Sequence, residues 1–470
     1  MTYTGTLRHY QQEAVIFTTN RKSTLLGHDL GLGKSHISMA YCEQIKHQNP
    51  NVLILCPSAI IYQWQEEITK FTDSKCIVIN GSKKQRQKQW QEDAYYYITN
   101  YEKLRTDIEL FQKTWGVVIL DECTKIKSPK AILTQKSYQL RAVKKLCLSG
   151  TPIHNTPNDL YSIVNFLYPN LLGSWWQFAN RYIEFEQREM NGYRFNEVVG
   201  YRNLDELHRK ISMFFIRKRK EDVLKELPPV IYETLTCEMN PNQADVYEQI
   251  FEEMIALHDE ENILHLLTAL KLLSNHPTLL KETKGEKIKK FSPLISDESS
   301  GKLKVLLEFI EENKDKKIVV FSEYVKMLHI IAQNLTIPYR MFNGQQSKED
   351  NNKALHEFRE KEEVRILLSS ESGGYGVNLQ NASIVVNYDL PYNPSDFMQR
   401  VGRLHRIGQL NPVVCINLIT FSSIENKVLK ILLSKQMMID QIVEGSVNEV
   451  SFIKEIWREL KNERNNGIII

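Results

Sequence analysis

Residues 399–409 have the sequence QRVGRLHRIGQ and predict a short helix with a defined start and end. Asn393 is suited to the N-cap and Pro394 to the first helical position, because the first turn of a helix leaves N–H groups without helical acceptors. Gly408 is suited to the position just after a helix, where a left-handed backbone is common. These residues therefore predict a helix that stops near Gly408.

Three polar residues of this predicted helix, Gln399, Arg403 and Arg406, follow an i, i+4, i+7 spacing. That spacing places them on one helical face. Two guanidinium groups on one face repel each other unless an anion lies between them. The segment therefore predicts a phosphate-binding face, provided that the chain also binds a nucleotide.

A glycine-rich segment, Gly27–Ser35, supplies a candidate nucleotide site between a predicted strand and a predicted helix. Glycines let backbone N–H groups curl around phosphate oxygens, and the helix N-terminus adds its dipole. Lys34 is expected at the β- and γ-phosphates and Ser35 at Mg²⁺. The generic P-loop has glycine where His28 stands, so a tight glycine turn is the alternative interpretation.

An acidic pair, Asp121 and Glu122, follows the continuous apolar run Val117–Leu120. Such a run predicts a strand that is buried on both faces. Open α/β sheets bind their ligands at the carboxyl ends of strands, where this pair stands. Asp121 is therefore expected in the Mg²⁺ shell, and Glu122 is expected to polarise the attacking water.

These motifs resemble those of the SNF2 group of superfamily 2 helicase-like ATPases, and the resemblance extends over nearly the whole chain. The ending Arg-Ile-Gly-Gln and the run Gly-Gly-x-Gly-x-Asn-Leu are far more specific than a Gly-Lys-Ser triplet. The segments that resemble the family's motifs, in the family's order, are Leu7–Gln11, Asp29–Ser35, Cys56–Ser58 with Trp64 and Glu67, Thr99–Glu102, Asp121–Thr124, Leu148–Asn155, Ile318–Ser322, Gly373–Leu379 and Gln399–Gln409.

Alternation of short apolar segments with polar helical ones predicts parallel sheets covered by helices, an α/β fold class. The resemblance implies two RecA-like parallel-sheet lobes with helical insertions. The expected regions are a first RecA-like, ATP-binding lobe at 1–155, its helical protrusion at 156–235, a helical insertion with a mobile charged loop at 236–300, a second RecA-like lobe at 301–424 and C-terminal bracing helices at 425–470.

The resemblance also implies that ATP is hydrolysed with Mg²⁺ between the two lobes. Glu122 is expected to orient and deprotonate water, while Arg403 and Arg406 stabilise the γ-phosphate when the lobes close. Lys34 and Gln399 complete the expected catalytic set. The residues expected to bind ATP are Arg8, Gln11, Asp29, Gly31, Leu32, Gly33, Lys34, Ser35, Asp121 and Gly376, of which Ser35 and Asp121 are expected to hold Mg²⁺.

Double-stranded DNA is the partner that the resemblance implies. Hydroxyls, amides and backbone N–H groups hold phosphate without reading sequence, and capping a loop is the alternative role for each candidate. The basic run Arg217–Lys220 is either a phosphate contact or a solvated face, and Trp64 is interpreted as a core anchor. The candidate DNA contacts carried over from the family are Pro57, Ser58, Asn100, Tyr101, Ser322, Ser370 and Asn378.

The sequence departs from the family's pattern in two motifs. Cys123 and Thr124 stand where the family usually has Ala-His, and that His couples the acidic motif to the motif at Leu148–Asn155. Glu371 stands where the family often has a basic residue. The motif coupling and one DNA contact are therefore open questions.

Length and composition agree with a motor core. The 470 residues exceed the roughly 250–300 at which a single core stops growing. The net charge is only +3, so a DNA path has to be a local basic surface. The seven cysteines form no C-x-x-C pair, which argues against structural zinc. No apolar segment approaches the ~20 residues of a membrane span, so no membrane association is expected.

Several functions are compatible with these motifs. The first is an ATP-driven double-stranded DNA translocase that remodels or displaces protein–DNA complexes. The alternatives are a strand-separating helicase or RNA-directed superfamily 2 motor, and a binding scaffold with an inactive ATPase. We expect a monomeric motor in a bacterial or phage-infected cytoplasm rather than in a nucleus, directed to its target by a protein partner, by surface detail or by DNA structure.

Overall fold

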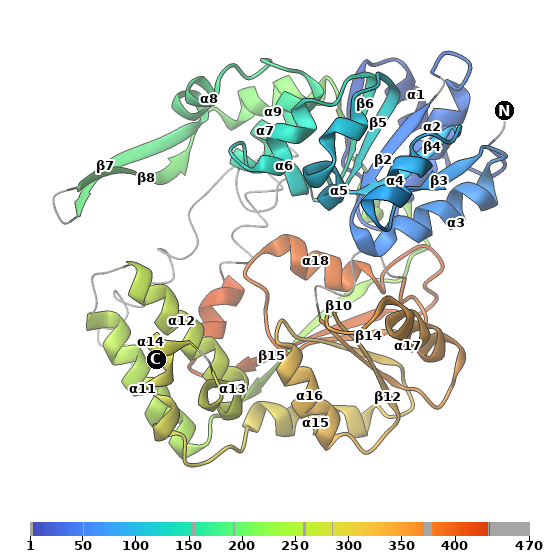
Figure 1. Cartoon of the computed structure of the whole chain (residues 1–470). Helices are drawn as coiled ribbons and strands as arrows, with labels where there is room; N and C mark the ends of the chain where they lie inside the picture. Colours follow the sequence, from blue (N-terminus) through green and yellow to red (C-terminus); the bar gives the residue numbers. More distant parts are fainter. Residues whose placement is uncertain are drawn as a thin grey trace. The chain divides into compact units, whose positions relative to one another are not determined.

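The chain divides into two compact units, the first ending at Leu227 and the second beginning at Pro228 (Figure 1). Each unit contains its own parallel sheet, so the α/β class with two parallel sheets and helical insertions is confirmed. The computed structural model describes residues 3–49, 51–151, 157–190, 193–256, 260–283, 285–370, 378–430 and 432.

The sheet of the first unit has seven strands in the order β3-β4-β2-β5-β6-β1-β9, all paired in parallel. Its central strands are buried along their whole length, as their continuous apolar runs predict. The strands are β1 (Ser23–Leu26), β2 (Val52–Cys56), β3 (Cys76–Val78), β4 (Tyr96–Asn100), β5 (Trp115–Asp121), β6 (Ala142–Leu148) and β9 (Phe215–Ile216).

Helices cover both faces of this sheet, because each face contributes to a separate apolar core. Residues of α1, α2 and α3 pack with one core, and residues of α5, α7, α8 and α9 pack with the other. The helices of the first unit are α1 (His9–Thr19), α2 (Lys34–Gln44), α3 (Ile61–Phe71), α4 (Lys83–Gln89), α5 (Tyr101–Thr106), α6 (Ile132–Tyr138), α7 (Asn158–Leu167), α8 (Trp175–Tyr182), α9 (Leu204–Ser212) and α10 (Lys220–Val223).

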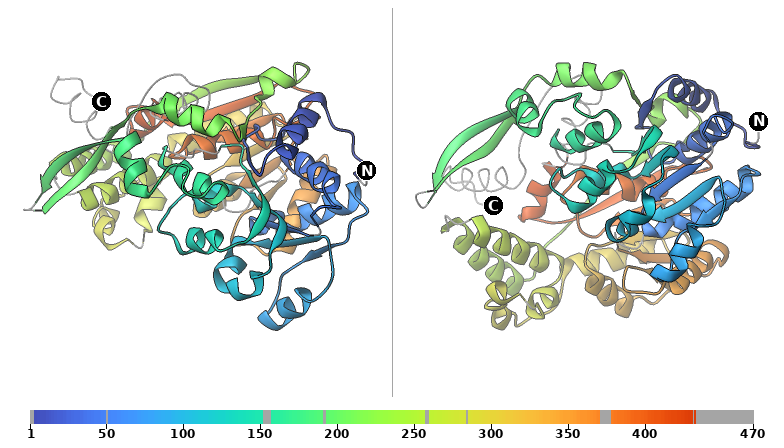
Figure 2. Two further views of the ribbon diagram at one scale, coloured as in Figure 1. Left: turned by 90° about the horizontal axis from the view of Figure 1, so that it is seen from above. Right: turned by 45° about the horizontal axis from the view of Figure 1, so that its top comes forward.

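The protrusion of the first unit contains a β-hairpin in addition to helices. Strands β7 (Ile183–Met190) and β8 (Tyr193–Tyr201) pair in antiparallel fashion and extend away from α8, as Figure 2 shows. The region expected as a helical protrusion therefore also contains a strand pair that was not predicted. A sequence signal was present, because apolar and polar residues alternate here around Asn191-Gly192, a pair typical of hairpin turns.

The second unit contains a six-stranded parallel sheet in the order β10-β15-β14-β11-β13-β12. The strands are β10 (Val230–Cys237), β11 (Ile318–Phe321), β12 (Tyr339–Phe342), β13 (Ile366–Ser369), β14 (Ile384–Asn387) and β15 (Val413–Thr420). The helices are α11 (Pro241–Ala256), α12 (Glu260–Asn275), α13 (Pro277–Lys281), α14 (Glu286–Lys289), α15 (Gly301–Glu312), α16 (Val325–Asn334), α17 (Lys348–Glu360) and α18 (Pro394–Gly402).

Two expected boundaries differ from the structure. Strand β10 pairs with β15 along its whole length, so the second unit begins at Pro228 and not after residue 235. The charged segment expected as a mobile loop contains α14, and its residues Ile288, Phe291 and Ile295 are buried in the core of the second unit. Their spacing is helical, and the surrounding lysines concealed it.

The C-terminal bracing helices are described only at their start. Residues 424–430 are helical, and most of 425–470 lies outside the described residues. Within the described part of the chain, no helix combines the length and the apolar character needed to cross a bilayer.

A buried ion pair fixes the start of this C-terminal helix to the second unit. Lys302 of α15 pairs with Glu425, both side chains are almost fully buried, and the Lys302 Nζ also donates to Asn275 Oδ1 over 3.2 Å. The second carboxylate oxygen of Glu425 accepts the Thr420 N–H over 2.9 Å. Each charge in this cluster is therefore hydrogen-bonded, as burial requires.

We expect Lys302→Met to destabilise the second unit by about 3–5 kcal/mol, because it leaves the Glu425 carboxylate buried without its cation. The control is Lys304→Met on the same helix, since the Lys304–Glu308 pair is exposed and should be worth less than about 1 kcal/mol. Adding Glu425→Gln to Lys302→Met should recover most of the loss. Urea unfolding followed by circular dichroism measures these differences, and equal midpoints for the two single variants would contradict the prediction.

Candidate nucleotide-binding and catalytic site

The glycine-rich loop connects β1 to α2, as predicted. Gly31 and Gly33 have φ values of +85° and +75°, a region that glycine adopts without steric cost. The Lys34 Nζ donates to the carbonyl oxygens of His28 and Asp29 over 2.8 and 3.3 Å, so the ammonium group lies inside the curl of the loop. The loop and lysine therefore have the geometry of a phosphate cradle.

His28 occupies the position where the generic pattern has glycine. Its imidazole is fully buried, and its ring centroid lies 6.0 Å from that of Tyr10. Burial, together with the nearby charges of Lys34 and Lys218, lowers the pKa of His28 to about 3. The ring is therefore neutral and adds no charge to the loop.

The N-terminal motif is hydrogen-bonded to this loop. The Gln11 Nε2 donates to the Leu32 carbonyl oxygen over 3.2 Å, and the Gln11 Oε1 accepts the Arg8 N–H over 2.8 Å. The Tyr10 hydroxyl donates to the same Leu32 oxygen over 3.2 Å. The structure thus brings together the predicted residues Arg8, Gln11 and Leu32, while a contact of Gln11 with adenine stays a prediction.

Asp29 connects the loop to the basic run Arg217–Lys220. Its Oδ1 lies 3.4 Å from the Arg217 Nη2, and its Oδ2 accepts the Lys220 N–H over 3.1 Å. Lys218 of the same run pairs with Glu13 over 2.8 Å. Neither interpretation from the sequence, a phosphate contact or a solvated face, anticipated that the run binds the nucleotide loop.

The acidic pair lies at the carboxyl end of β5. The Asp121 Oδ2 accepts the Trp64 indole N–H over 2.8 Å, and its Oδ1 accepts the Glu122 N–H over 3.0 Å. Burial raises the pKa of Asp121, while the bond from Trp64 and the charge of Lys34 lower it. Lys34 and Asp121 therefore belong to one electrostatic site, although they are 87 positions apart in the sequence.

Glu122 has a left-handed backbone, with φ of 51° and ψ of 56°. A non-glycine residue in this region is strained, and such strain is found chiefly at functional sites. Glu122 stands directly after the last residue of β5 and directly before the short helix Cys123–Ile126. The left-handed backbone gives the side chain of Glu122 a direction that an extended continuation of the strand would not give.

The departure from the family's acidic motif places a thiol in the core. Cys123 is fully buried and belongs to the same apolar core as Cys147, the penultimate residue of β6. Burial raises the pKa of the Cys123 thiol well above its ordinary value. The acidic motif and the strand that leads into the Leu148–Asn155 motif thus share this core; residues 152–155 of that motif lie outside the described residues.

The arginine helix of the second unit begins as predicted and ends early. The Asn393 Oδ1 accepts the Asp396 N–H over 2.8 Å, and Pro394 is the first helical residue. The helix ends at Gly402 with Arg403 as its C-cap. The expected continuation to Gly408 is wrong, because glycine is a poor helix former at position 402.

Arg406 therefore lies outside the helix, and its expected common helical face with Gln399 and Arg403 is not formed. The Arg406 Nε donates to the Gly402 carbonyl oxygen over 2.8 Å. Gln409 fixes the turn, since its Nε2 donates to the carbonyl oxygens of Ala382 and Leu404 over 2.9 and 3.3 Å. No sequence pattern predicts this role for Gln409.

Gln399 and Arg403 are largely buried within the second unit, with 8% and 4% of their surface exposed. The Arg403 guanidinium lies 5.1 Å from the centre of the Phe321 ring. Arg400, which the sequence analysis did not single out, is also buried and donates to the Asn387 Oδ1 and the Asp389 carbonyl oxygen over 3.1 and 2.6 Å. A role of Arg403 and Arg406 at a phosphate stays a prediction.

Most of the predicted DNA contacts have buried side chains. The Tyr101 hydroxyl donates to the Asp121 carbonyl oxygen over 2.7 Å, and the Ser322 hydroxyl donates to Asp389. Both hydroxyls are thus hydrogen-bonded inside the protein, and their contact with DNA stays a prediction. Pro57, Asn100 and Ser370 are also buried, whereas Ser58 is partly exposed and Asn378 exposed; Gly376 lies outside the described residues.

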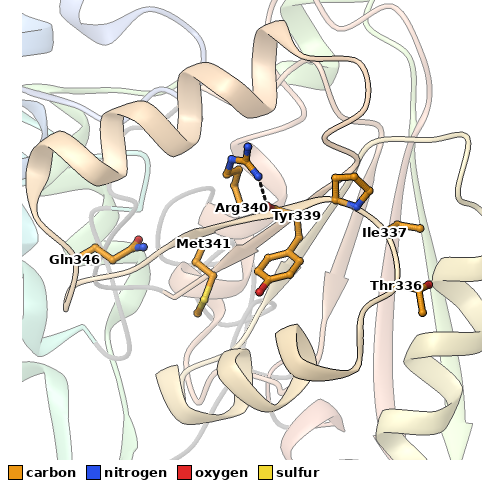
Figure 3. Close-up of a pocket in the computed structure, with 7 residues that line it drawn as sticks. Thr336, Ile337, Tyr339, Arg340, Met341 and Gln346 are labelled. Carbon is orange, nitrogen blue, oxygen red and sulfur yellow. Dashed lines mark hydrogen bonds between the residues drawn. The ribbon is translucent and has the colours of Figure 1, made fainter.

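A surface pocket of about 690 Å³ lies along the edge strand β12 of the second unit (Figure 3). Its lining contains none of the predicted site residues. It is formed by Thr336, Ile337, Pro338, Tyr339, Arg340, Met341 and Gln346, and the Arg340 guanidinium donates to the Tyr339 carbonyl oxygen over 2.7 Å.

We expect Gly33→Ala to weaken ATP binding by at least about tenfold, since the strained backbone costs about 1–2 kcal/mol and the added Cβ would lie 2.4 Å from the Gln11 Nε2. The matched control is Gly81→Ala, because Gly81 has φ of +89° and its Cβ would lie 2.6 Å from the Gln85 Oε1. Both variants should lose similar stability in thermal unfolding. Titration with a fluorescent ATP analogue should separate them, and equal affinities would contradict the prediction.

Two family models match the chain, and known proteins resemble it over most of its length. The family model for the SNF2-related domain matches residues 10–279, and that for the helicase conserved C-terminal domain matches residues 301–408. The putative ATP-dependent helicase/translocase YwqA of Bacillus subtilis is 29% identical over 94% of this chain and 49% of its own length. The chromodomain-helicase-DNA-binding protein 1-like of Danio rerio is 27% identical over 93% of this chain and 44% of its own length.

The chain thus spans about half the length of these curated relatives or less. A solved structure, the Sulfolobus solfataricus SWI2/SNF2 ATPase core in complex with dsDNA, is 27% identical, with 100% of this chain and 98% of that chain covered and a TM-score of 0.45. Because the SNF2-related domain model matches more than half of the 470 residues, this chain belongs to the SNF2 family of helicase-like proteins.

Proposed function

We propose that this protein hydrolyses ATP and uses the energy to move along double-stranded DNA, where it remodels or displaces protein–DNA complexes. The observation that carries the ATPase proposal is that the glycine loop with Lys34, after β1, and the acidic pair, after β5, leave the sheet of the first unit at one edge. The order of the strands explains it, since β1 and β5 both pair with β6 and present their carboxyl ends at the same edge.

The residues present fit Mg²⁺ and a nucleotide. A carboxylate, Asp121, and a hydroxyl, Ser35, are oxygen donors of the kind that Mg²⁺ prefers. Mg²⁺ bound there would neutralise charge that develops on the phosphates. Lys34 would hold the terminal phosphates, and the N–H groups around Gly31 and Gly33 would hold their oxygens.

Glu122 supplies the proton acceptor in this proposal. Its carboxylate would orient a water molecule and take its proton as the water attacks the γ-phosphate, a role worth roughly 10²–10⁴ in rate. The left-handed backbone at Glu122 is consistent with a side chain held for chemistry. Arg403 and Arg406 of the second unit would stabilise the charge of the transition state.

Movement along duplex DNA is proposed from the family. The Bacillus subtilis relative is named a putative ATP-dependent helicase/translocase, a name that covers both activities, so ATP use alone does not separate translocation from strand separation. The Arg-Ile-Gly-Gln ending and the two helical insertions are typical of the SNF2 group and favour the duplex. Ser58 and Asn378 are the candidate phosphate contacts whose side chains reach the surface.

We expect duplex DNA to stimulate ATP hydrolysis more than single-stranded DNA or RNA does. The protein should also displace a third strand from a triplex and leave a forked duplex paired. Steady-state ATPase assays with each nucleic acid, followed by the two displacement assays, test this. Stimulation mainly by single strands, together with fork unwinding, would favour a helicase or an RNA-directed motor, and absence of hydrolysis under every condition would favour a binding scaffold.

We expect Arg406→Ala to bind ATP normally and to lose turnover by about 10³-fold or more, because an arginine that contacts the transferred phosphate acts in the transition state. A suitable control is Arg340→Ala, which removes a surface arginine of the same unit that pairs with Glu357. ATP affinity and kcat, measured with saturating duplex, separate binding from chemistry. Turnover equal to that of the control would remove Arg406 from the mechanism.

A further inference from the structure

Two aromatic side chains outside the nucleotide loop hold the acidic motif. The Trp64 indole N–H of α3 donates to the Asp121 Oδ2 over 2.8 Å, and the Tyr101 hydroxyl of α5 donates to the Asp121 carbonyl oxygen over 2.7 Å. Each aromatic residue has only 2% of its surface exposed. One donor thus fixes the carboxylate of Asp121, and the other fixes its main chain.

These bonds also reach the expected proton acceptor. The Asp121 Oδ1 accepts the Glu122 N–H over 3.0 Å, and Glu122 has the left-handed backbone described above. Rotation of the Asp121 carboxylate away from Trp64 would therefore weaken the bond that helps to hold the Glu122 main chain. The Trp64 indole consequently acts directly on the Asp121 carboxylate. It acts indirectly on Glu122, through the hydrogen bond between the Glu122 N–H and Asp121.

Both aromatic residues come from the segments whose family counterparts are expected to contact nucleic acid. Trp64 lies on α3, six residues after Ser58, and Tyr101 is the first residue of α5, directly after Asn100. The Asn100 Nδ2 donates to the Ser58 Oγ over 3.0 Å, and the Ser58 Oγ donates to the Glu102 Oε2 over 3.2 Å. These hydrogen bonds join the two segments into one polar cluster with Ser58 partly exposed.

The order of the strands makes a short connection from this cluster to Asp121. Strands β4, β2 and β5 are neighbours, and Cys56 at the end of β2 pairs in register with Asn100 at the end of β4. The segments after β2 and β4 and the acidic motif after β5 therefore leave the sheet at one edge. If the Ser58–Asn100 cluster shifts, Trp64 and Tyr101 can transmit the shift directly to the acidic motif, because both are hydrogen-bonded to Asp121.

We propose that Trp64 and Tyr101 are positioning residues that couple engagement of a nucleic-acid backbone at the Ser58–Asn100 cluster to the geometry of Asp121 and Glu122. The coupling rests on the proposed function, in which that cluster meets phosphate and the acidic pair hydrolyses ATP. In this coupling the two aromatic residues transmit the stimulation of ATP hydrolysis by DNA. This role replaces that of core anchor for Trp64 and that of DNA contact for Tyr101.

A packing role alone does not require these polar atoms. Trp90 of the same unit packs among Tyr97, Phe111 and Trp115, and its indole N–H has no hydrogen-bond acceptor among the described residues. The unit therefore tolerates an indole without an acceptor. The Trp64 N–H, in contrast, is directed at the carboxylate that is expected to bind Mg²⁺.

The test uses Trp64→Phe and Tyr101→Phe in the full chain, since each keeps an aromatic ring and removes one donor. The matched controls are Trp90→Phe, which removes an indole without an acceptor, and Tyr97→Phe, which removes a hydroxyl that donates to the Glu92 carbonyl oxygen over 2.8 Å. Thermal unfolding compares the four variants. If Trp64→Phe does not fold, Tyr101→Phe, which loses a single oxygen atom, decides the matter.

Two readouts are measured for each variant. The first is the Mg²⁺ concentration that half-saturates binding of a fluorescent ATP analogue, which should rise about 10–100-fold in Trp64→Phe, as for other changes behind a metal ligand. The second is the ratio of kcat with saturating duplex to kcat without DNA, which should fall by about tenfold in both test variants. Both controls should match the wild type in these two quantities.

The outcomes separate the coupling from the proposed function. Equal loss of basal and stimulated turnover, with an unchanged Mg²⁺ requirement, would overturn the coupling. A wild-type protein that hydrolyses ATP at one rate with and without nucleic acid would refute the proposed translocase and the coupling together. In that case the Mg²⁺ titration alone would decide whether Trp64 positions Asp121.

Discussion

The carboxylate of Asp121 stands at the end of β5, a strand that is buried along its whole length, and the site of the first unit depends on this charge being hydrogen-bonded there. Burial disfavours an anion unless donors surround it. The structure supplies the Trp64 indole, the Glu122 main chain and the nearby Lys34 ammonium. These groups come from three motifs that are far apart in the sequence, so satisfying one charge also assembles the site.

The second unit uses the same physical solution with a different aspartate. Asp389 is fully buried two residues after β14 and accepts hydrogen bonds from the Ser322 hydroxyl and from the Glu323 N–H, the latter over 2.9 Å. The Arg400 guanidinium lies 3.6 Å from its carboxylate and also donates to its carbonyl oxygen. The last turn of the arginine helix is thereby fixed to the carboxyl ends of β11 and β14.

The strands and the nucleotide loop could be predicted from the sequence because their signals are local. Continuous apolar runs indicate buried strands, and the spacing of Gly31, Gly33 and Lys34 indicates a loop that faces phosphate. The end of α18 at Gly402 was not predicted, because Gly408 matches a common pattern for the end of a helix. The packing of Ile288–Ile295 into the core was not predicted, because the charged composition of this segment is typical of a mobile loop.

The functions of Trp64 and Tyr101 could not be predicted in the same way. Their hydrogen bonds form because β4, β2 and β5 are neighbours in the sheet. The order of the strands cannot be predicted from the sequence of any single segment. The same holds for Arg217, whose partner Asp29 is 188 positions away in the sequence. Sequence patterns identify which residues are chemically capable, whereas tertiary contacts decide which of them act together.

The carboxylate of Asp29 has a mechanical consequence. It holds Arg217 and the main chain of Lys220, and the polypeptide continues from there for only a few residues before it leaves the first unit at Leu227. If phosphate rearranges the glycine loop, Asp29 moves with the loop. The tension in the segment from Lys220 to Leu227 would therefore change. Substitutions at positions 217–220 would then change how firmly the segment that leads to Leu227 is attached to the glycine loop. Such a change would alter the coupling of ATP hydrolysis to movement, independently of the affinity for ATP.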